Sequence, residues 1–228
     1  SIFRELNSSS DSTPIDFAGL LLSEDKPILK LTQQNRREIK LIENLCKGSS
    51  FVCLNLRDSA FMSSIRAKDM SYHNYRDSDV ATYSAAAEAL AEMGYTVFRM
   101  GALVKEPLVS RNPKVIDYAS NGMRTEFLDV FLGAHCNFCI STGSGWDSIP
   151  TIFRRPIMFV NHLPIFGPSA ITLPITIYPK LLRDERSPSS LSLAELIQRN
   201  LATPHNTAAY ADAGVEIRDL SSEELVEA

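Results

Sequence analysis

Residues 139–161 read CISTGSGWDSIPTIFRRPIMFVN and indicate the fold most clearly. The stretch opens with an apolar run, passes through Ser-Thr-Gly-Ser-Gly at residues 141–145, continues as a short amphipathic segment and ends in a second apolar run. Two apolar runs separated by a helical segment are typical of parallel strands joined by a helix. This stretch therefore predicts an α/β fold.

The same alternation extends through most of the chain. Strands are predicted at 51–56, 95–99, 114–118, 137–141 and 156–160. Helices are predicted from a Thr32 cap to Gly48, from a Ser78 or Asp79 cap to Gly94, over 124–135, over 145–154, and from a Ser221 or Ser222 cap onward. Strands that read as continuous apolar runs are buried on both faces. We expect a Rossmann-like, doubly wound parallel sheet in a domain spanning 31–228, preceded by an arm or linker at 1–30.

Composition narrows the class of protein. The chain has 228 residues, 44% of them hydrophobic, and a net charge of −4, so it can bury a core and has no overall basic character for binding nucleic acid. No apolar run approaches the roughly 20 residues that span a bilayer, and no signal-peptide pattern is present. We expect a cytoplasmic protein, or one peripheral to the inner membrane. The chain starts without Met and stops inside a helical pattern, so we expect a piece of a longer protein.

Residues that follow the predicted strands are the candidates for ligand binding, because ligands of parallel α/β sheets bind beyond the carboxyl ends of the strands. The glycines and hydroxyls of 141–145 precede a helix, where free N–H groups attract phosphate. The alternative is a tight turn in which Ser141 or Ser144 caps that helix. The candidate set for binding a phosphate-bearing donor comprises Arg57, Arg76, Arg99, Gly101, Ser141, Thr142, Gly143, Ser144, Gly145, Asp147 and Asn161.

Two other nucleotide sites fit the sequence poorly. Gly143-Ser-Gly145-Trp-Asp-Ser148 matches only the first two glycines of the dinucleotide fingerprint, and the next strand ends in Asn161 rather than an acidic residue. No Gly-Lys-Ser/Thr follows the loop, which excludes a P-loop.

The segment Asp77-Ser78-Asp79 has two interpretations. Two carboxylates could hold Mg²⁺ or Mn²⁺ against a diphosphate. The triplet also stands where a helix begins, and we favour capping there, with no metal site and no cofactor. Asp58, His73 and Asp77 are the candidate catalytic bases, since each is near a strand end or in the loop after it.

The four cysteines are Cys46, Cys53, Cys136 and Cys139. His135-Cys136-x-x-Cys139 invites a zinc or redox interpretation, but no second ligand pair stands at motif spacing and no helix follows directly. We expect buried structural thiols.

A resemblance adds to these observations. FVCLNLRDSAF at 51–61, YHNYRDSDVATYSAAAEALAEMGYTVFRMG at 72–101, VIDYAS at 115–120 and FLDVFLGAHCNFCISTGSGWDSIPTIFRRPIMFVN at 127–161 together resemble a family of bacterial glycosyltransferases linked to surface-polysaccharide synthesis. That family has the GT-B architecture of two Rossmann domains. The resemblance covers roughly 31–161. It implies that this chain is the donor-binding half, that a nucleotide sugar and a glycan or lipid-linked glycan are its substrates, and that an N-terminal domain of the same protein is its partner.

A more distant likeness is to fucosyltransferases that use GDP-sugars, which have a His-x-Arg-Arg motif at a strand end. Here Asn55 stands at the histidine and Asp58 at the second arginine. The likeness matches Arg57 to the diphosphate-contacting arginine and 141–145 to the donor-binding loop.

We therefore expect a glycosyltransferase that needs no metal. Two alternatives stay open: a nucleotide- or glycan-binding module without turnover, and another phosphate-handling transferase such as a polysaccharide pyruvyl transferase.

Overall fold

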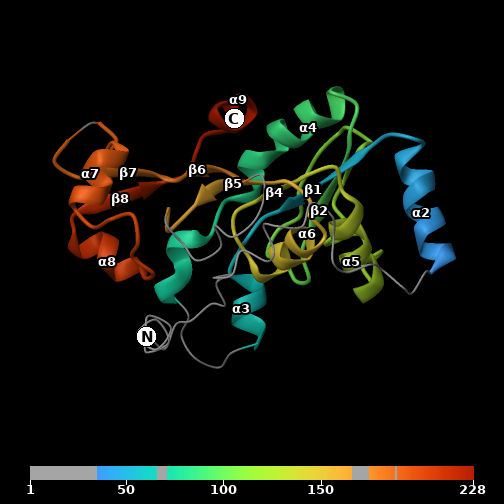
Figure 1. The fold of residues 1–228 in the computed structure, drawn as a ribbon, viewed down its shortest axis with the longest axis horizontal. Coiled ribbons are helices and arrows are strands. Elements are labelled where there is room, and N and C mark those ends of the chain that lie inside the picture. The colour runs from blue at the N-terminus through green and yellow to red at the C-terminus, as the bar shows by residue number, and fades with distance from the viewer. Residues whose placement is uncertain (1–34, 66–70, 166–174, 188) are drawn as a thin grey trace, which may run out of the picture.

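The computed structural model describes residues 35–65, 71–165, 175–187 and 189–228, and these form an α/β fold around a six-stranded parallel sheet (Figure 1). Its strands are β1 (Phe51–Asn55), β2 (Thr96–Met100), β3 (Val115–Ile116), β4 (Cys139–Ser141), β5 (Ile157–His162) and β6 (Ile175–Pro179). They lie in the order β3-β2-β1-β4-β5-β6, and every neighbouring pair is parallel. This is the strand order of a Rossmann-like, doubly wound sheet, as predicted.

Helices cover both faces of the sheet. One face packs against α2 (Arg36–Cys46), α5 (Glu126–His135) and α6 (Ser148–Ile152), and the other against α4 (Ser84–Glu92) and α9 (Ser222–Glu227) (Figure 1). Alternate residues of β1 show why: Cys53 joins the first core, whereas Val52 and Leu54 join the second. Side chains alternate across a strand, so a continuous apolar run serves two cores.

Short helical segments occupy the loops at the carboxyl edge. They are α3 (Ala60–Ile65) and three 3₁₀ helices, η2 (Ser71–Arg76), η3 (Val80–Tyr83) and η4 (Gly145–Asp147). The predicted helix from Ser78 or Asp79 to Gly94 thus begins as the 3₁₀ turn η3, and the Asp79 side chain accepts the Ala81 N–H at 2.9 Å. The capping role favoured for this triplet belongs to Asp79.

Residues 181–218 correct the expectation of one doubly wound sheet up to residue 228. They contain an antiparallel pair, β7 (Leu181–Asp184) and β8 (Val215–Arg218), with α7 (Leu193–Gln198) and α8 (Thr207–Asp212). This C-terminal unit has its own core, which includes Leu182, Leu196 and Tyr210. Neither strand was predicted, because Leu-Leu-Arg-Asp and Val-Glu-Ile-Arg are short and half polar and give no continuous apolar run.

Other boundaries differ more modestly from the prediction. β6 was not predicted, and β3 is only two residues long. Asn35 caps α2, whereas Thr32 and the predicted arm at 1–30 lie outside the described residues. Ser221 caps α9 as predicted, in a capping box with Glu224.

All four cysteines are buried and free, which confirms their structural role. Burial raises the pKa of Cys53 and of Cys139 well above the usual range, so both stay protonated thiols. Within the part of the chain that the structure describes, every helix is too short or too polar to cross a membrane.

Candidate functional site

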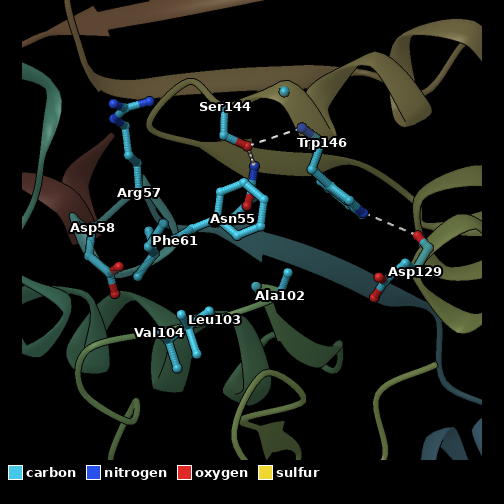
Figure 2. A pocket seen from close by; sticks show the side chains of 13 residues that line it. Asn55, Arg57, Asp58, Phe61, Ala102, Leu103, Val104, Asp129, Ser144 and Trp146 are labelled. Carbon is cyan, nitrogen blue, oxygen red and sulfur yellow. Dashed lines mark hydrogen bonds between the residues drawn. The ribbon is translucent and has the colours of Figure 1, made fainter. Parts of the chain in front are cut away.

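A cavity of about 400 Å³ opens at the carboxyl edge of the sheet, beside the ends of β1 and β4 (Figure 2). The chain leaves β1 toward β2 on one side and β4 toward β5 on the other, so this is the switch point where doubly wound sheets bind ligands. The lining residues are Asn55, Leu56, Arg57, Asp58, Phe61, Gly101, Ala102, Leu103, Val104, Asp129, Ser144, Gly145 and Trp146.

The two ends of the cavity differ in their main side chain, an arginine at one and a tryptophan at the other, and each has a carboxylate nearby, Asp58 and Asp129. Arg57 stands at one end in Figure 2, and Trp146 and Asp129 stand toward the other. Phe61 and Leu103 line the space between them and keep 44% and 47% of their surface exposed. Large exposed apolar side chains in a concave site favour a ligand with an apolar or aromatic body. The arginine favours an anionic group on that same ligand.

The loop 141–147 is held by an internal carboxylate. Asp147 is buried and accepts hydrogen bonds from Asn55 Nδ2 at 2.7 Å, Ser141 Oγ at 2.7 Å and Ser144 N at 2.6 Å. Ser144 in turn accepts from Trp146 N at 3.2 Å and from Asn55 Nδ2 at 2.7 Å. The two residues form a capping box at η4. The alternative in which Ser144 caps the helix is therefore what the structure shows.

This network changes which backbone groups can meet a ligand. The N–H groups of Gly143 and Ser144 already donate to Ser141 Oγ and to Asp147. Gly145 N–H has no acceptor among the described residues, Gly145 lines the cavity, and a Cβ built there would meet no atom within 4 Å. Of the broad phosphate cradle expected over 141–145, there thus remains one N–H without an acceptor among the described residues, on a residue that lines the cavity.

The charge of Asp147 is costly in this position. Burial raises the pKa of its carboxyl above the usual value, and the hydrogen bonds from Ser144, Ser141 and Asn55 and the charge of Arg76 pull it back. An acidic side chain therefore occupies the position at the helix start where a bound anion would otherwise be expected.

Arg57 lies beside this loop, as expected. Its N–H donates to Thr142 Oγ1 at 2.7 Å, and Thr142 N–H donates to Asn55 O at 3.1 Å, so β1 and the loop are joined directly. The guanidinium Nε lies 3.4 Å from Asp77 Oδ1, and the side chain is 13% exposed at the cavity wall. Burial raises the pKa of Asp77, and Arg57 opposes that shift.

Arg76 and His162 pack on the other side of the loop. Arg76 NH2 donates to Gly143 O at 2.9 Å. A Cβ built on Gly143 would lie 2.8 Å from His162 Cδ2 and 3.4 Å from Arg76 NH2, and Gly143 has φ +91. Glycine is required here by close packing and backbone conformation, rather than by the approach of a phosphate.

The positive groups here affect each other. Burial first, and then the charge of Arg57, lowers the pKa of Arg76. Burial, and then the charge of Arg76, lowers the pKa of His162 to about 4, so His162 is neutral near pH 7.

Arg99 supports the cavity wall from beneath and does not line it. It is fully buried, with NH1 3.3 Å from Asp117 Oδ1 and NH2 3.8 Å from Asp58 Oδ2. Asp58 also accepts N–H groups from Ala60 and Lys105, and Asp117 accepts from Leu108. Through these two carboxylates Arg99 orders the loop that includes Gly101 and Leu103.

Asn161 and His73 also lie apart from the cavity. Asn161 belongs to β5, has φ +49, donates to Tyr83 OH at 2.7 Å and accepts from Leu220 N at 2.7 Å, all on the α4–α9 side. His73 lies in η2 with its ring 4.0 Å from that of Tyr72. Asp58 is the one candidate base that lines the cavity.

Several residues of the site were not among the sequence candidates, and Asn55, His162, Phe61 and Trp146 show two reasons for this. Asn55 and His162 are polar residues at the ends of buried strands, a signal that the sequence does contain. Phe61 and Trp146 stand in loop helices, and only the fold brings them to one cavity.

A search of protein-family models, of curated proteins and of solved structures found no match to this chain.

Proposed function

We propose that this protein is the donor-binding part of a glycosyltransferase, and that the cavity beside β1 and β4 holds a nucleoside-diphosphate sugar. The observation that supports this most is the pairing of the Arg57 guanidinium at one end with an apolar space between Phe61, Leu103 and Trp146. A nucleotide has both chemistries, since its base is a flat apolar body and its phosphates are anionic.

In the proposed reaction an acceptor hydroxyl attacks the anomeric carbon of the donor sugar. The bond from that carbon to the β-phosphate oxygen breaks, and the electron pair leaves with the nucleoside diphosphate. Arg57 and the N–H of Gly145 at the cavity, with the charge of the nearby Arg76, stabilise the charge on the leaving group. The acceptor proton passes to a carboxylate, for which Asp58 is the candidate at the cavity wall.

A second candidate function is nucleotide binding without turnover. The observation that favours it is how fully the candidate bases are engaged. Asp58 accepts two backbone N–H groups and faces Arg99, and Asp77 pairs with Arg57. A general base needs a free lone pair directed at the acceptor.

A ligand screen tests both candidates. Trp146 is the single tryptophan and lines the cavity, so its fluorescence reports ligand binding there. We expect quenching and a raised melting temperature with one of the UDP, GDP or dTDP sugars, unchanged in EDTA. Loss of binding in EDTA, with recovery in Mn²⁺, would reverse the expectation that no metal is needed.

The same samples separate the two functions. Release of free sugar from the bound donor over hours, or transfer to a glycan acceptor, identifies the transferase. Tight donor binding with neither product, also when the full-length gene product is assayed, identifies the binding module. A response to phosphoenolpyruvate and to no nucleotide sugar would overturn both and favour the pyruvyl transferase alternative.

A further inference from the structure

The C-terminal unit and the cavity are connected through one loop, residues 71–78. Its helical part, η2, packs against α8 of the C-terminal unit (Figure 1). The last residue of η2, Arg76, contacts the Gly143 loop, and the next residue, Asp77, pairs with Arg57. The loop therefore touches both parts of the molecule.

Thr207, the first residue of α8, makes the hydrogen bonds in the contact between α8 and η2. Its hydroxyl lies 3.2 Å from Ser71 O and 3.0 Å from Tyr72 O, to which it can donate, and it accepts the Tyr75 N–H at 3.3 Å. One hydroxyl thus joins both ends of η2. The Tyr75 ring, buried in the core of the C-terminal unit, lies 5.6 Å from the Tyr210 ring.

The side chain that follows Tyr75 is Arg76. Its NH2 group donates to Gly143 O, and its guanidinium lies against the Gly143 α-carbon beside His162. Its own Nε is buried and makes no hydrogen bond within the described residues. The Gly143 loop gives the Arg76 guanidinium only this one hydrogen bond among the described residues. The position of the Arg76 side chain therefore depends on the backbone of η2.

We propose that Thr207 is a positioning residue of the candidate site: it holds η2 so that Arg76 stays fixed against the Gly143 loop. The cavity would then depend on a residue of the C-terminal unit that touches no ligand. The expectation that Thr207 influences nucleotide binding rests on the proposed function. The expectation that Thr207 influences the order of the Gly143 loop does not.

Amide hydrogen exchange tests the structural step without any ligand. Thr207→Val removes the hydroxyl at nearly constant volume, and Thr207→Ser keeps it. We expect Thr207→Val to speed exchange in 141–145 as well as in 71–76, and Thr207→Ser to leave 141–145 as in the wild type. In an Arg76→Ala background, Thr207→Val should not speed the exchange of 141–145 any further, because both substitutions act through the Arg76 side chain.

Nucleotide binding gives the second readout. If UDP or GDP quenches Trp146 in the wild type, Thr207→Val should weaken that binding roughly two- to tenfold, and again not in the Arg76→Ala background. A wild type that binds no nucleotide would count against the proposed function, while the exchange result would still decide the role of Thr207.

Faster exchange confined to 71–76 and 206–212, with 141–145 unchanged, would show a merely local role and overturn the proposal. Equal effects of Thr207→Val with and without Arg76 would also overturn it. If Thr207→Val does not fold, Thr207→Ala removes the hydroxyl without added bulk and is read in the same way.

Discussion

Arg57 is the residue on which the proposed binding depends most directly. It is the cationic side chain at the cavity wall, and its Nε faces Asp77 at 3.4 Å rather than a tightly bonded carboxylate. A guanidinium held in that way can still bind a phosphate with its terminal nitrogens.

We expect Arg57→Ala to weaken binding of a nucleoside diphosphate by about 1.5–3 kcal/mol, the range for a hydrogen bond to a charged group. That corresponds to roughly ten- to hundredfold in the dissociation constant, measured by Trp146 fluorescence. Arg186→Ala is the matched control, because the Arg186 side chain is 85% exposed and lies outside the cavity lining. Equal affinities for the Arg57→Ala variant and the wild type would contradict the placement of phosphate at Arg57.

His162 makes the stability of the fold depend on pH. Its folded pKa of about 4 lies below the usual 6.5, because burial and the charge of Arg76 disfavour the protonated ring. The unfolded chain therefore takes up a proton that the folded protein does not, and stability that is present above pH 6.5 is lost as the pH falls toward 4.

The loss that His162 causes should reach about 3 kcal/mol at pH 4, by the conversion of 1.36 kcal/mol per pKa unit. Urea unfolding at pH 7, 5.5 and 4.5 measures it. Between pH 7 and pH 4.5, the free energy of unfolding should fall less for His162→Asn than for the wild type. For His205→Asn, at an exposed position, it should fall as much as for the wild type. A wild-type slope that His162→Asn leaves unchanged would disprove the burial of a neutral ring.

At the scale of elements, the loop between β4 and α6 is ordered by packing as much as by capping. Asp147 and Ser144 close the helix start, and Gly143 lets His162 and Arg76 approach the backbone. Gly122 offers a comparison, since it has a similar φ of +81 but no atom within 4 Å of a Cβ.

Gly122→Ala should therefore cost only the backbone strain, about 1–3 kcal/mol, whereas Gly143→Ala should cost that strain and a further overpacking term of similar size. Chemical unfolding of the two variants gives the difference. An equal decrease in the free energy of unfolding for the two variants would show that His162 and Arg76 move aside without cost.

At the scale of the whole molecule, the C-terminal unit and the parallel sheet share side chains. Tyr75 and Leu163 come from loops at the carboxyl edge of the sheet, yet they belong to the core of the C-terminal unit. We infer that the two parts unfold together.

Leu182→Ala tests this, since Leu182 is buried in that smaller core and its truncation should cost about 2–5 kcal/mol. Trp146 lies beside the parallel sheet, and its fluorescence transition should shift to lower urea by as much as the circular dichroism transition. Leu193→Ala, at an exposed position, should shift neither. A Trp146 transition that stays in place while circular dichroism shows an early step would mean separate units.

Helices and strands that are marked by neighbouring residues in the chain could be predicted from the sequence. Apolar runs such as Phe51–Asn55 and caps such as Ser221 depend on neighbouring residues, so five strands of the parallel sheet could be predicted. Arg57 and the loop 141–145 were expected at one edge because parallel strands end together.

The contacts that those residues make there could not be predicted from the sequence. Arg57 and Arg99 look alike in sequence, each at the end of a buried strand, yet Arg57 reaches the cavity and Arg99 is buried between Asp58 and Asp117. The N–H groups of the loop looked free, but Asp147 satisfies Ser144 N–H and bonds Asn55 from another strand. Such choices depend on partners far apart in the chain, because a buried polar group takes whichever partner the fold brings within hydrogen-bond distance.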